Sequence, residues 1–233
     1  MRHIILLPGM DGTGQLFESL EAALAPRFVT HVVSYPPDEK LNYRQLMPYV
    51  RRAVPPSEPY IVVAESFSGP LAIEHASARP ANLLGLVLCA SCVAKPLPLG
   101  LRWLRVLARE SPFRRSAPLW LTRHFLVGRD CPSDLGESVR AAMQAVHPSV
   151  LAYRLRLILD SNVRDKLRSI EVPVLYIAGA HDRLIGRRGL AQISTLLRSV
   201  STAILDGPHL LLQRLPHASA QEISRFMDQK VTA

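Results

Sequence analysis

The sequence predicts an α/β domain in which a parallel sheet carries helices on both faces. Six short runs rich in Val, Ile and Leu recur along the 233 residues, and helical patterns lie between most of them. Most of the runs are continuously apolar rather than alternating, which is typical of parallel strands buried on both faces. Hydrophobic residues make up 48% of the chain, so a large buried core is expected and a disordered chain is not.

Each apolar run predicts one strand: His3–Leu7, Val29–Ser34, Tyr60–Ala64, Leu84–Leu88, Val174–Ala178 and Ser201–Leu205. Apolar residues at helical spacing predict helices after five of these strands: Gln15–Leu24, Leu41–Ala53, Phe67–Ala78, Leu190–Leu197 and Ala218–Met227. Alternation of strand and helix is typical of a doubly wound α/β sheet.

The fourth and fifth strands are separated by about 85 residues, although a simple crossover needs only about a dozen or more. Most of this interval carries Leu and Trp at helical spacings and is interrupted by prolines. We interpret residues 94–170 as a lid of about four helices, and residues 1–93 and 171–233 as the core domain. Trp103 and Trp120 are expected to pack inside the lid.

The positive charge of the chain is concentrated in this predicted lid. Residues 94–170 contain 14 Lys and Arg and 6 Asp and Glu, a net +8 of the chain's +9. Clustered charge of this kind attracts an anionic partner, and a solvated helical surface is an equally good interpretation. Nucleic acid is a poor candidate partner, because the basic residues are not interleaved with aromatic side chains that could stack on bases.

No apolar run approaches the roughly 18–20 residues of a membrane-spanning helix. The short apolar stretch at the N-terminus leads into Pro8 and Gly9, which favours a buried strand over a secretory signal. Three cysteines are too few for a disulfide framework, so we expect a cytoplasmic protein. Cys89 and Cys92 form a single C-x-x-C pair, which does not predict zinc without a second pair.

A candidate nucleophile follows the third strand, in Glu65-Ser66-Phe67-Ser68-Gly69. A nucleophile elbow needs small residues two before and two after its serine, and Ala64 and Ser68 meet this need around Ser66. Choosing Ser68 instead would place Pro70 in a small position, where it fits poorly. The alternative interpretation of Ser66 is a serine that caps the following helix.

Two further candidates follow the fifth and sixth strands. Asp182 and His209 lie on loops expected at the same sheet edge as Ser66, because the carboxyl ends of parallel strands meet there. Taken singly, Asp182 could be a turn residue and His209 a structural histidine, and Asp206 is an alternative acid. Together with Ser66 they predict a nucleophile, a base and an acid that orients the base.

The glycine-rich loop from Pro8 to Gly14 follows the first strand. It lacks both the G-x-G-x-x-G spacing and the P-loop lysine, which argues against nucleotide binding. In a hydrolase, the backbone N–H groups of Met10 and Phe67 would instead receive the oxyanion. This chemistry needs no metal and no cofactor.

The sequence resembles the α/β-hydrolase superfamily in LLPGMDGTG, VVAESFSGPLAI, VPVLYIAGAHDRLIG and LDGPHLLLQRLP, and in the chain order Ser, Asp, His. The resemblance implies spatial strand order 2-1-3-4-5-6 and a serine carboxylesterase that works through an acyl-enzyme. The sequence differs from the family pattern at three points. Pro8 precedes the oxyanion glycine, Pro208 precedes the histidine, and two initial strands that the family often has are missing.

Two narrower resemblances concern the substrate. LPGMDGTG is similar to plant phytyl ester synthase-type acyltransferases, whereas the size and basic lid resemble pimeloyl-acyl-carrier-protein methyl ester esterases. The latter implies an acidic acyl carrier protein as partner, held by Arg102, Arg105 and Arg109. An acyltransferase or thioesterase with the same triad, a cofactor-free lyase or haloperoxidase, and a binding protein without activity are the alternatives.

Overall fold

The computed structural model describes residues 2–94, 110–114 and 119–231. Its sheet has six strands in the order β2-β1-β3-β4-β5-β6, and every neighbouring pair is parallel. The strands are β1 Arg2–Leu7, β2 Phe28–Val32, β3 Tyr60–Glu65, β4 Leu83–Cys89, β5 Val174–Gly179 and β6 Ser201–Leu205. The predicted fold class, strand order and strand positions are confirmed, with ends that shift by one or two residues.

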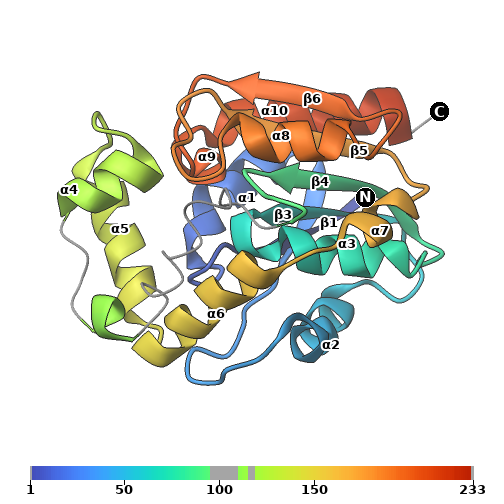
Figure 1. Ribbon diagram of the computed structural model, residues 1–233. Coiled ribbons are helices and arrows are strands. Elements are labelled where there is room, and N and C mark those ends of the chain that lie inside the picture. The colour runs from blue at the N-terminus through green and yellow to red at the C-terminus, as the bar shows by residue number, and fades with distance from the viewer. Residues whose placement is uncertain (1, 95–109, 115–118, 232–233) are drawn as a thin grey trace.

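Helices cover both faces of the sheet (Figure 1). One face packs against α1 Glu18–Leu24 and α10 Pro216–Phe226. The other face packs against α2 Tyr43–Ala53, α3 Gly69–Ser77, α7 Arg164–Arg168 and α8 Arg187–Ser194. Shorter helical segments lie at Gln15–Phe17, Ser66–Ser68, Ser111–Phe113, α9 Leu211–Arg214 and Met227–Val231.

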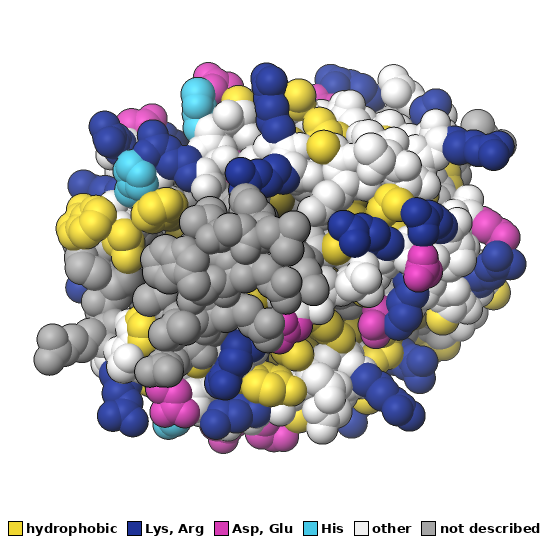
Figure 2. Space-filling model, viewed as in Figure 1, with side chains coloured by type: hydrophobic (Ala, Val, Ile, Leu, Met, Phe, Trp, Pro, Cys, Tyr) yellow, Lys and Arg dark blue, Asp and Glu magenta, His cyan; other side chains and the backbone are white. Residues whose placement is uncertain are grey.

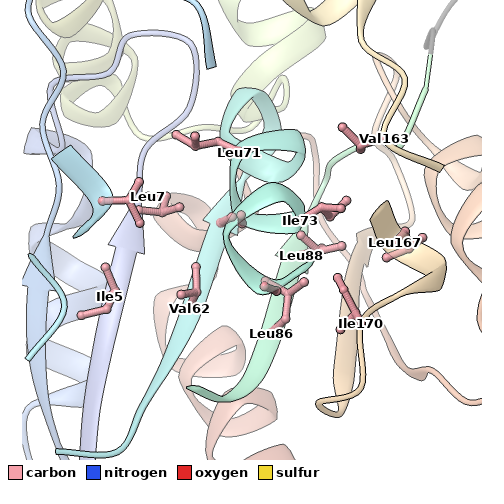
Figure 3. Packing of buried hydrophobic residues seen from close by; sticks show 14 of the residues in the cluster. Ile5, Leu7, Val62, Leu71, Ile73, Leu86, Leu88, Val163, Leu167 and Ile170 are labelled. Carbon is pink, nitrogen blue, oxygen red and sulfur yellow. The ribbon is translucent and has the colours of Figure 1, made fainter. Parts of the chain in front are cut away.

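The apolar runs of the strands supply the centre of the core. Every residue of β3 and of β5 is buried, which explains why neither run alternates with polar residues. Figure 3 shows the layer between the sheet and α3, to which strands, helix and the α7 region all contribute. The labelled side chains are Ile5, Leu7, Val62, Leu71, Ile73, Leu86, Leu88, Val163, Leu167 and Ile170.

The described part of the interval between β4 and β5 is largely helical. It contains α4 Leu119–Thr122, the π-helical segment Arg123–Val127, α5 Ser133–Gln144, α6 Pro148–Asp160 and α7. Figure 1 shows α4 and α5 beside the edge at which the strand arrows end. Val163 and Leu167 pack in the main core, so the end of this interval joins the core domain. The assignment of residues 94–170 to a lid stays a prediction.

Within the described residues, no helix combines the length and the apolar character needed to cross a membrane. All three cysteines are buried free thiols.

Candidate active site

Ser66 lies in a strained turn directly after β3. Its φ is 45°, in the left-handed region that a side chain disfavours, and such a residue persists only where its surroundings hold it. Ser91 Oγ donates a hydrogen bond to the Ser66 carbonyl oxygen at 2.8 Å, and the Gly69 N–H donates to the same oxygen. The turn therefore projects Ser66 from the sheet edge where β1, β5 and β6 also end.

The loops after β5 and β6 are hydrogen-bonded to each other. Ala180 N–H donates to the Leu205 carbonyl at 2.8 Å, and His181 N–H donates to the Gly207 carbonyl at 3.0 Å. Gly179 packs so closely on the backbone of this second loop that a Cβ atom there would overlap the carbonyl oxygens of Gly207 and Pro208. The two loops are thus held together, which brings Asp182 to His209.

The structure joins Ser66, His209 and Asp182 by hydrogen bonds. His209 Nε2 lies 2.9 Å from Ser66 Oγ, and His209 Nδ1 lies 3.0 Å from Asp182 Oδ2. The side chains of His209 and Asp182 are 4% and 2% exposed. An ionised carboxylate is an acceptor and never a donor, so His209 must carry its proton on Nδ1, facing Asp182 Oδ2. This leaves Nε2 free to accept a hydrogen bond from the Ser66 hydroxyl.

Asp182 is held in its ionised form by three hydrogen-bond donors, the first of which is His209 Nδ1. Its other oxygen, Oδ1, accepts from the N–H groups of Leu184 at 2.8 Å and Ile185 at 3.1 Å. Burial raises the pKa of Asp182, but the hydrogen bond and charge of His209, with these two N–H groups, bring the pKa below its ordinary value. A charged Asp182 is what an orienting acid requires.

Asp206, the alternative acid, is paired with a different histidine. Its Oδ1 lies 2.8 Å from His181 Nε2, and both side chains are largely exposed. His209 receives its carboxylate from Asp182 instead.

Ser68, the alternative nucleophile, is fully buried. Its Oγ donates to the Pro8 carbonyl oxygen, so the nearby Tyr35 hydroxyl, 2.7 Å away, must be the donor of the Tyr35–Ser68 bond. Ser68 therefore connects the Ser66 turn to the loop after β1. In the turn around Ser66, Gly69 cannot carry a side chain, because a Cβ atom there would overlap Ser91 Oγ.

Glu65 is a buried carboxyl group directly before Ser66. It is 1% exposed, and Gln213 Nε2 donates to its Oε2 at 3.0 Å. Burial raises the pKa of Glu65 to about 8, with a further contribution from the charge of Asp11. We did not anticipate Glu65 as a functional residue, although a charged residue at the end of an otherwise apolar strand was a signal.

The loop that contains Met10 forms a β-turn from Gly9 to Gly12, closed by a 3.1 Å hydrogen bond between Gly12 N–H and the Gly9 carbonyl. Phe67 is buried, and its carbonyl accepts from the Tyr43 hydroxyl at 3.0 Å. Their assignment as oxyanion donors stays a prediction.

The predicted partner-binding residues Arg102, Arg105 and Arg109 lie outside the described residues, as does Trp103. Trp120 is 67% exposed, so its predicted place inside the lid is wrong. In Figure 2, Lys and Arg side chains are spread over the coloured part of this face rather than gathered in one patch.

The sequence profile of the alpha/beta hydrolase family matches residues 4–223. The chain belongs to the alpha/beta hydrolase family. The protein is therefore a hydrolase, as the sequence predicts. No curated protein sequence matches this α/β-hydrolase.

Solved structures of several activities share this α/β-hydrolase's fold. An esterase from Exiguobacterium antarcticum superposes with a TM-score of 0.85 at 12% identity, over 98% of this chain and 92% of the esterase. An enol-lactonase from Burkholderia xenovorans LB400 has a TM-score of 0.76 at 17% identity, and a bromoperoxidase from Bacillus anthracis 0.77 at 14%, each over 98% of this chain and 92% of the other. At these identities the likeness establishes the fold alone, and the fold does not select among reactions.

Proposed function

We propose that this α/β-hydrolase cleaves carboxylic esters through an acyl-enzyme formed on Ser66. The observation that carries the proposal is the hydrogen-bonded chain from Ser66 Oγ through His209 to Asp182, with separations of 2.9 and 3.0 Å. These distances match what a serine, a base and an orienting acid need.

In the first half of the reaction, His209 Nε2 accepts the Ser66 hydroxyl proton while Oγ bonds to the ester carbonyl carbon. The charged imidazole then gives this proton to the departing alkoxide, which leaves as an alcohol. In the second half, His209 takes a proton from water, the hydroxide attacks the acyl carbon, and Ser66 regains its proton as the acid is released. Asp182 stabilises the charged imidazole throughout.

The oxyanion of each tetrahedral intermediate is proposed to accept from the N–H groups of Met10 and Phe67. Phe67 follows Ser66 in the chain, and the hydrogen bond from Ser68 Oγ to the Pro8 carbonyl links the loop that contains Met10 to the Ser66 turn. Donors of this kind typically each contribute about 10²–10³ in rate.

The test combines a fluorophosphonate probe with hydrolysis of p-nitrophenyl esters. Ser66→Ala should lose both labelling and hydrolysis, since the nucleophile is gone. Ser57→Ala, at an exposed serine, is the matched control and should behave as the wild type. Equal labelling of Ser66→Ala and wild type would exclude Ser66 as the nucleophile.

We further propose an acyl carrier protein as the vehicle of the acyl group, which rests on the net +8 of residues 94–170. Part of this charge is already used within the chain, because Arg154 is buried and Arg114, Lys166 and Arg168 pair with Glu110, Glu74 and Asp165. Arg102, Arg105 and Arg109 are the residues proposed to bind the acidic carrier. Replacing them by Glu should reduce activity on a carrier-linked ester and leave activity on a small neutral ester unchanged. Equal loss on both substrates would contradict a carrier-binding role.

Transfer to an alcohol and hydrolysis of a thioester use the same residues. Product analysis with and without added alcohol separates transfer from hydrolysis, because only transfer yields a new ester. Parallel assays on acyl thioesters and oxygen esters identify the leaving group.

A further inference from the structure

Arg154 of α6 points into the protein rather than into solvent. It is 2% exposed and is the largest fully buried side chain among the described residues. In the sequence it follows Val150 and Leu151 by four and three residues, and both of these are buried, so it lies on the apolar face of α6. A buried guanidinium costs several kcal/mol unless its N–H groups are satisfied, and Arg remains charged in such sites.

Within the described part of the chain, the Arg154 guanidinium makes three hydrogen bonds, and each goes to a backbone carbonyl oxygen. Nη1 donates to Met10 at 3.1 Å and to Asp11 at 2.6 Å, and Nη2 donates to Pro36 at 2.9 Å. Its Cζ atom lies over the Tyr35 and Phe67 rings, 5.7 and 6.0 Å from their centroids. The guanidinium thus contacts the Met10 loop and the Phe67 ring at the same time.

Met10 and Asp11 are the two central residues of the β-turn from Gly9 to Gly12. The Gly9 carbonyl is engaged by Gly12 N–H inside the turn. Because N–H and C=O point in opposite directions across a trans peptide, this bond directs Met10 N–H away from the interior of the turn. Binding of the next two carbonyls by Arg154 holds the rest of the turn in the same orientation.

The turn is shaped to receive Arg154. Gly12 has a φ of 68°, and a Cβ atom there would overlap Arg154 Nη1 and lie 2.9 Å from Tyr35 Cδ2. Tyr35 N–H also donates to the Gly12 carbonyl at 2.8 Å. A side chain at residue 12 would therefore displace the guanidinium from the carbonyls that it binds.

We propose that Arg154 is a positioning residue that holds the Met10 N–H in place to receive the oxyanion. Through it, α6 of the predicted lid is connected to the loop that contains Met10. The inference rests on the proposed esterase function and on Met10 as an oxyanion donor. Arg154 is thus one of the 14 basic residues between positions 94 and 170, but it has a specific role inside the protein rather than on its surface.

The experiment compares Arg154→Met with Arg156→Met, a control on the exposed side of the same helix. Three quantities are measured: steady-state hydrolysis of p-nitrophenyl butyrate, inhibition by an alkyl trifluoromethyl ketone, and inhibition by the matched methyl ketone. The first ketone forms a tetrahedral alkoxide with Ser66, whereas the second stays a carbonyl and reports ground-state binding. Thermal melting establishes that each variant is folded at the assay temperature.

Loss of positioning should lower kcat/KM of Arg154→Met by about 10- to 100-fold, less than removal of an oxyanion donor itself. Inhibition by the trifluoromethyl ketone should weaken by the same factor, while KM and inhibition by the methyl ketone stay near their wild-type values. Arg154→Lys keeps the charge but loses the planar fork. Its kcat/KM and its inhibition by the trifluoromethyl ketone should therefore fall less than those of Arg154→Met. It also supplies the comparison if Arg154→Met does not fold.

A folded Arg154 variant with wild-type kcat/KM and wild-type trifluoromethyl ketone inhibition would overturn the positioning role. Equal weakening of both ketones would also overturn it, because it would place Arg154 in substrate binding. Failure of the proposed function has a separate signature, since Ser66→Ala would then retain hydrolysis and labelling.

Discussion

Glu65 and Gln213 form a buried carboxyl–amide pair behind the candidate nucleophile. Gln213 Nε2 donates to Glu65 Oε2 at 3.0 Å, and within the described residues neither Glu65 Oε1 nor Gln213 Oε1 has a hydrogen-bond partner. A protonated Glu65 has an O–H to donate, and Gln213 Oε1 is an acceptor without a donor. The pair is therefore better satisfied when Glu65 is neutral, in agreement with its pKa of about 8.

The first prediction concerns stability against pH. Unfolding returns the pKa of Glu65 from about 8 to its ordinary value of 4.5, so between these values the folded protein binds more protons than the unfolded chain. The free energy of unfolding should then fall as pH rises through this window, by up to about 1.4 kcal/mol per pH unit. Glu65→Gln should lack this contribution and gain stability relative to wild type towards pH 8.

Urea denaturation at pH 5, 6, 7 and 8 measures the effect. Glu58→Gln, at an exposed glutamate, should follow the wild-type slope. Identical slopes for wild type and Glu65→Gln would mean that Glu65 is ionised in the folded protein.

The second prediction concerns the acid. Asp182→Asn should lower kcat by about 10³–10⁴ at neutral pH, because an amide that donates to Nδ1 stabilises the wrong tautomer of His209. Asp206→Asn should stay near wild type, since Asp206 is 90% exposed and pairs with His181. A loss confined to Asp206→Asn would reverse the assignment of the acid.

The third prediction concerns Gly12. Gly12→Ala should destabilise the fold by about 1–3 kcal/mol, because the new Cβ overlaps Arg154 in a backbone conformation that alanine disfavours. Gly9→Ala is the control, as its Cβ would meet Glu65 Oε2 at an ordinary 3.4 Å. Equal midpoints of chemical denaturation for the two variants would contradict the role given to Gly12.

The fourth prediction tests the packing behind the Ser66 turn. Gly69→Ala should destabilise by about 1–3 kcal/mol through overlap with Ser91, and Ser91→Gly should cost about 1 kcal/mol through loss of the 2.8 Å bond to the Ser66 carbonyl. In the double variant the overlap is gone, so its stability should approach that of Ser91→Gly alone. Strict additivity in this double-mutant cycle would show that the two positions are not in contact.

Local sequence was sufficient to predict the strands and the loops that carry the candidate site. Continuous apolar runs such as Ile61–Ala64 can only be buried on both faces, and parallel strands must place their carboxyl ends at one edge. Ser66, Asp182 and His209 each follow such a run, so their meeting at that edge depends on topology rather than on side-chain detail. The strand order itself came from resemblance to a known family, because apolar pattern does not specify which strands are neighbours.

Tertiary structure alone decided how individual polar groups are satisfied. Arginine usually lies on the surface, but Arg154 is buried, because three backbone carbonyls from distant segments converge on its guanidinium. Asp206 lies three residues from His209 in sequence yet pairs with His181, because the two loops are hydrogen-bonded in a register that brings Asp182 to His209. These hydrogen-bond partners are 25 to 144 residues apart in sequence. Their pairing depends on positions within a few ångströms, which local propensity does not specify.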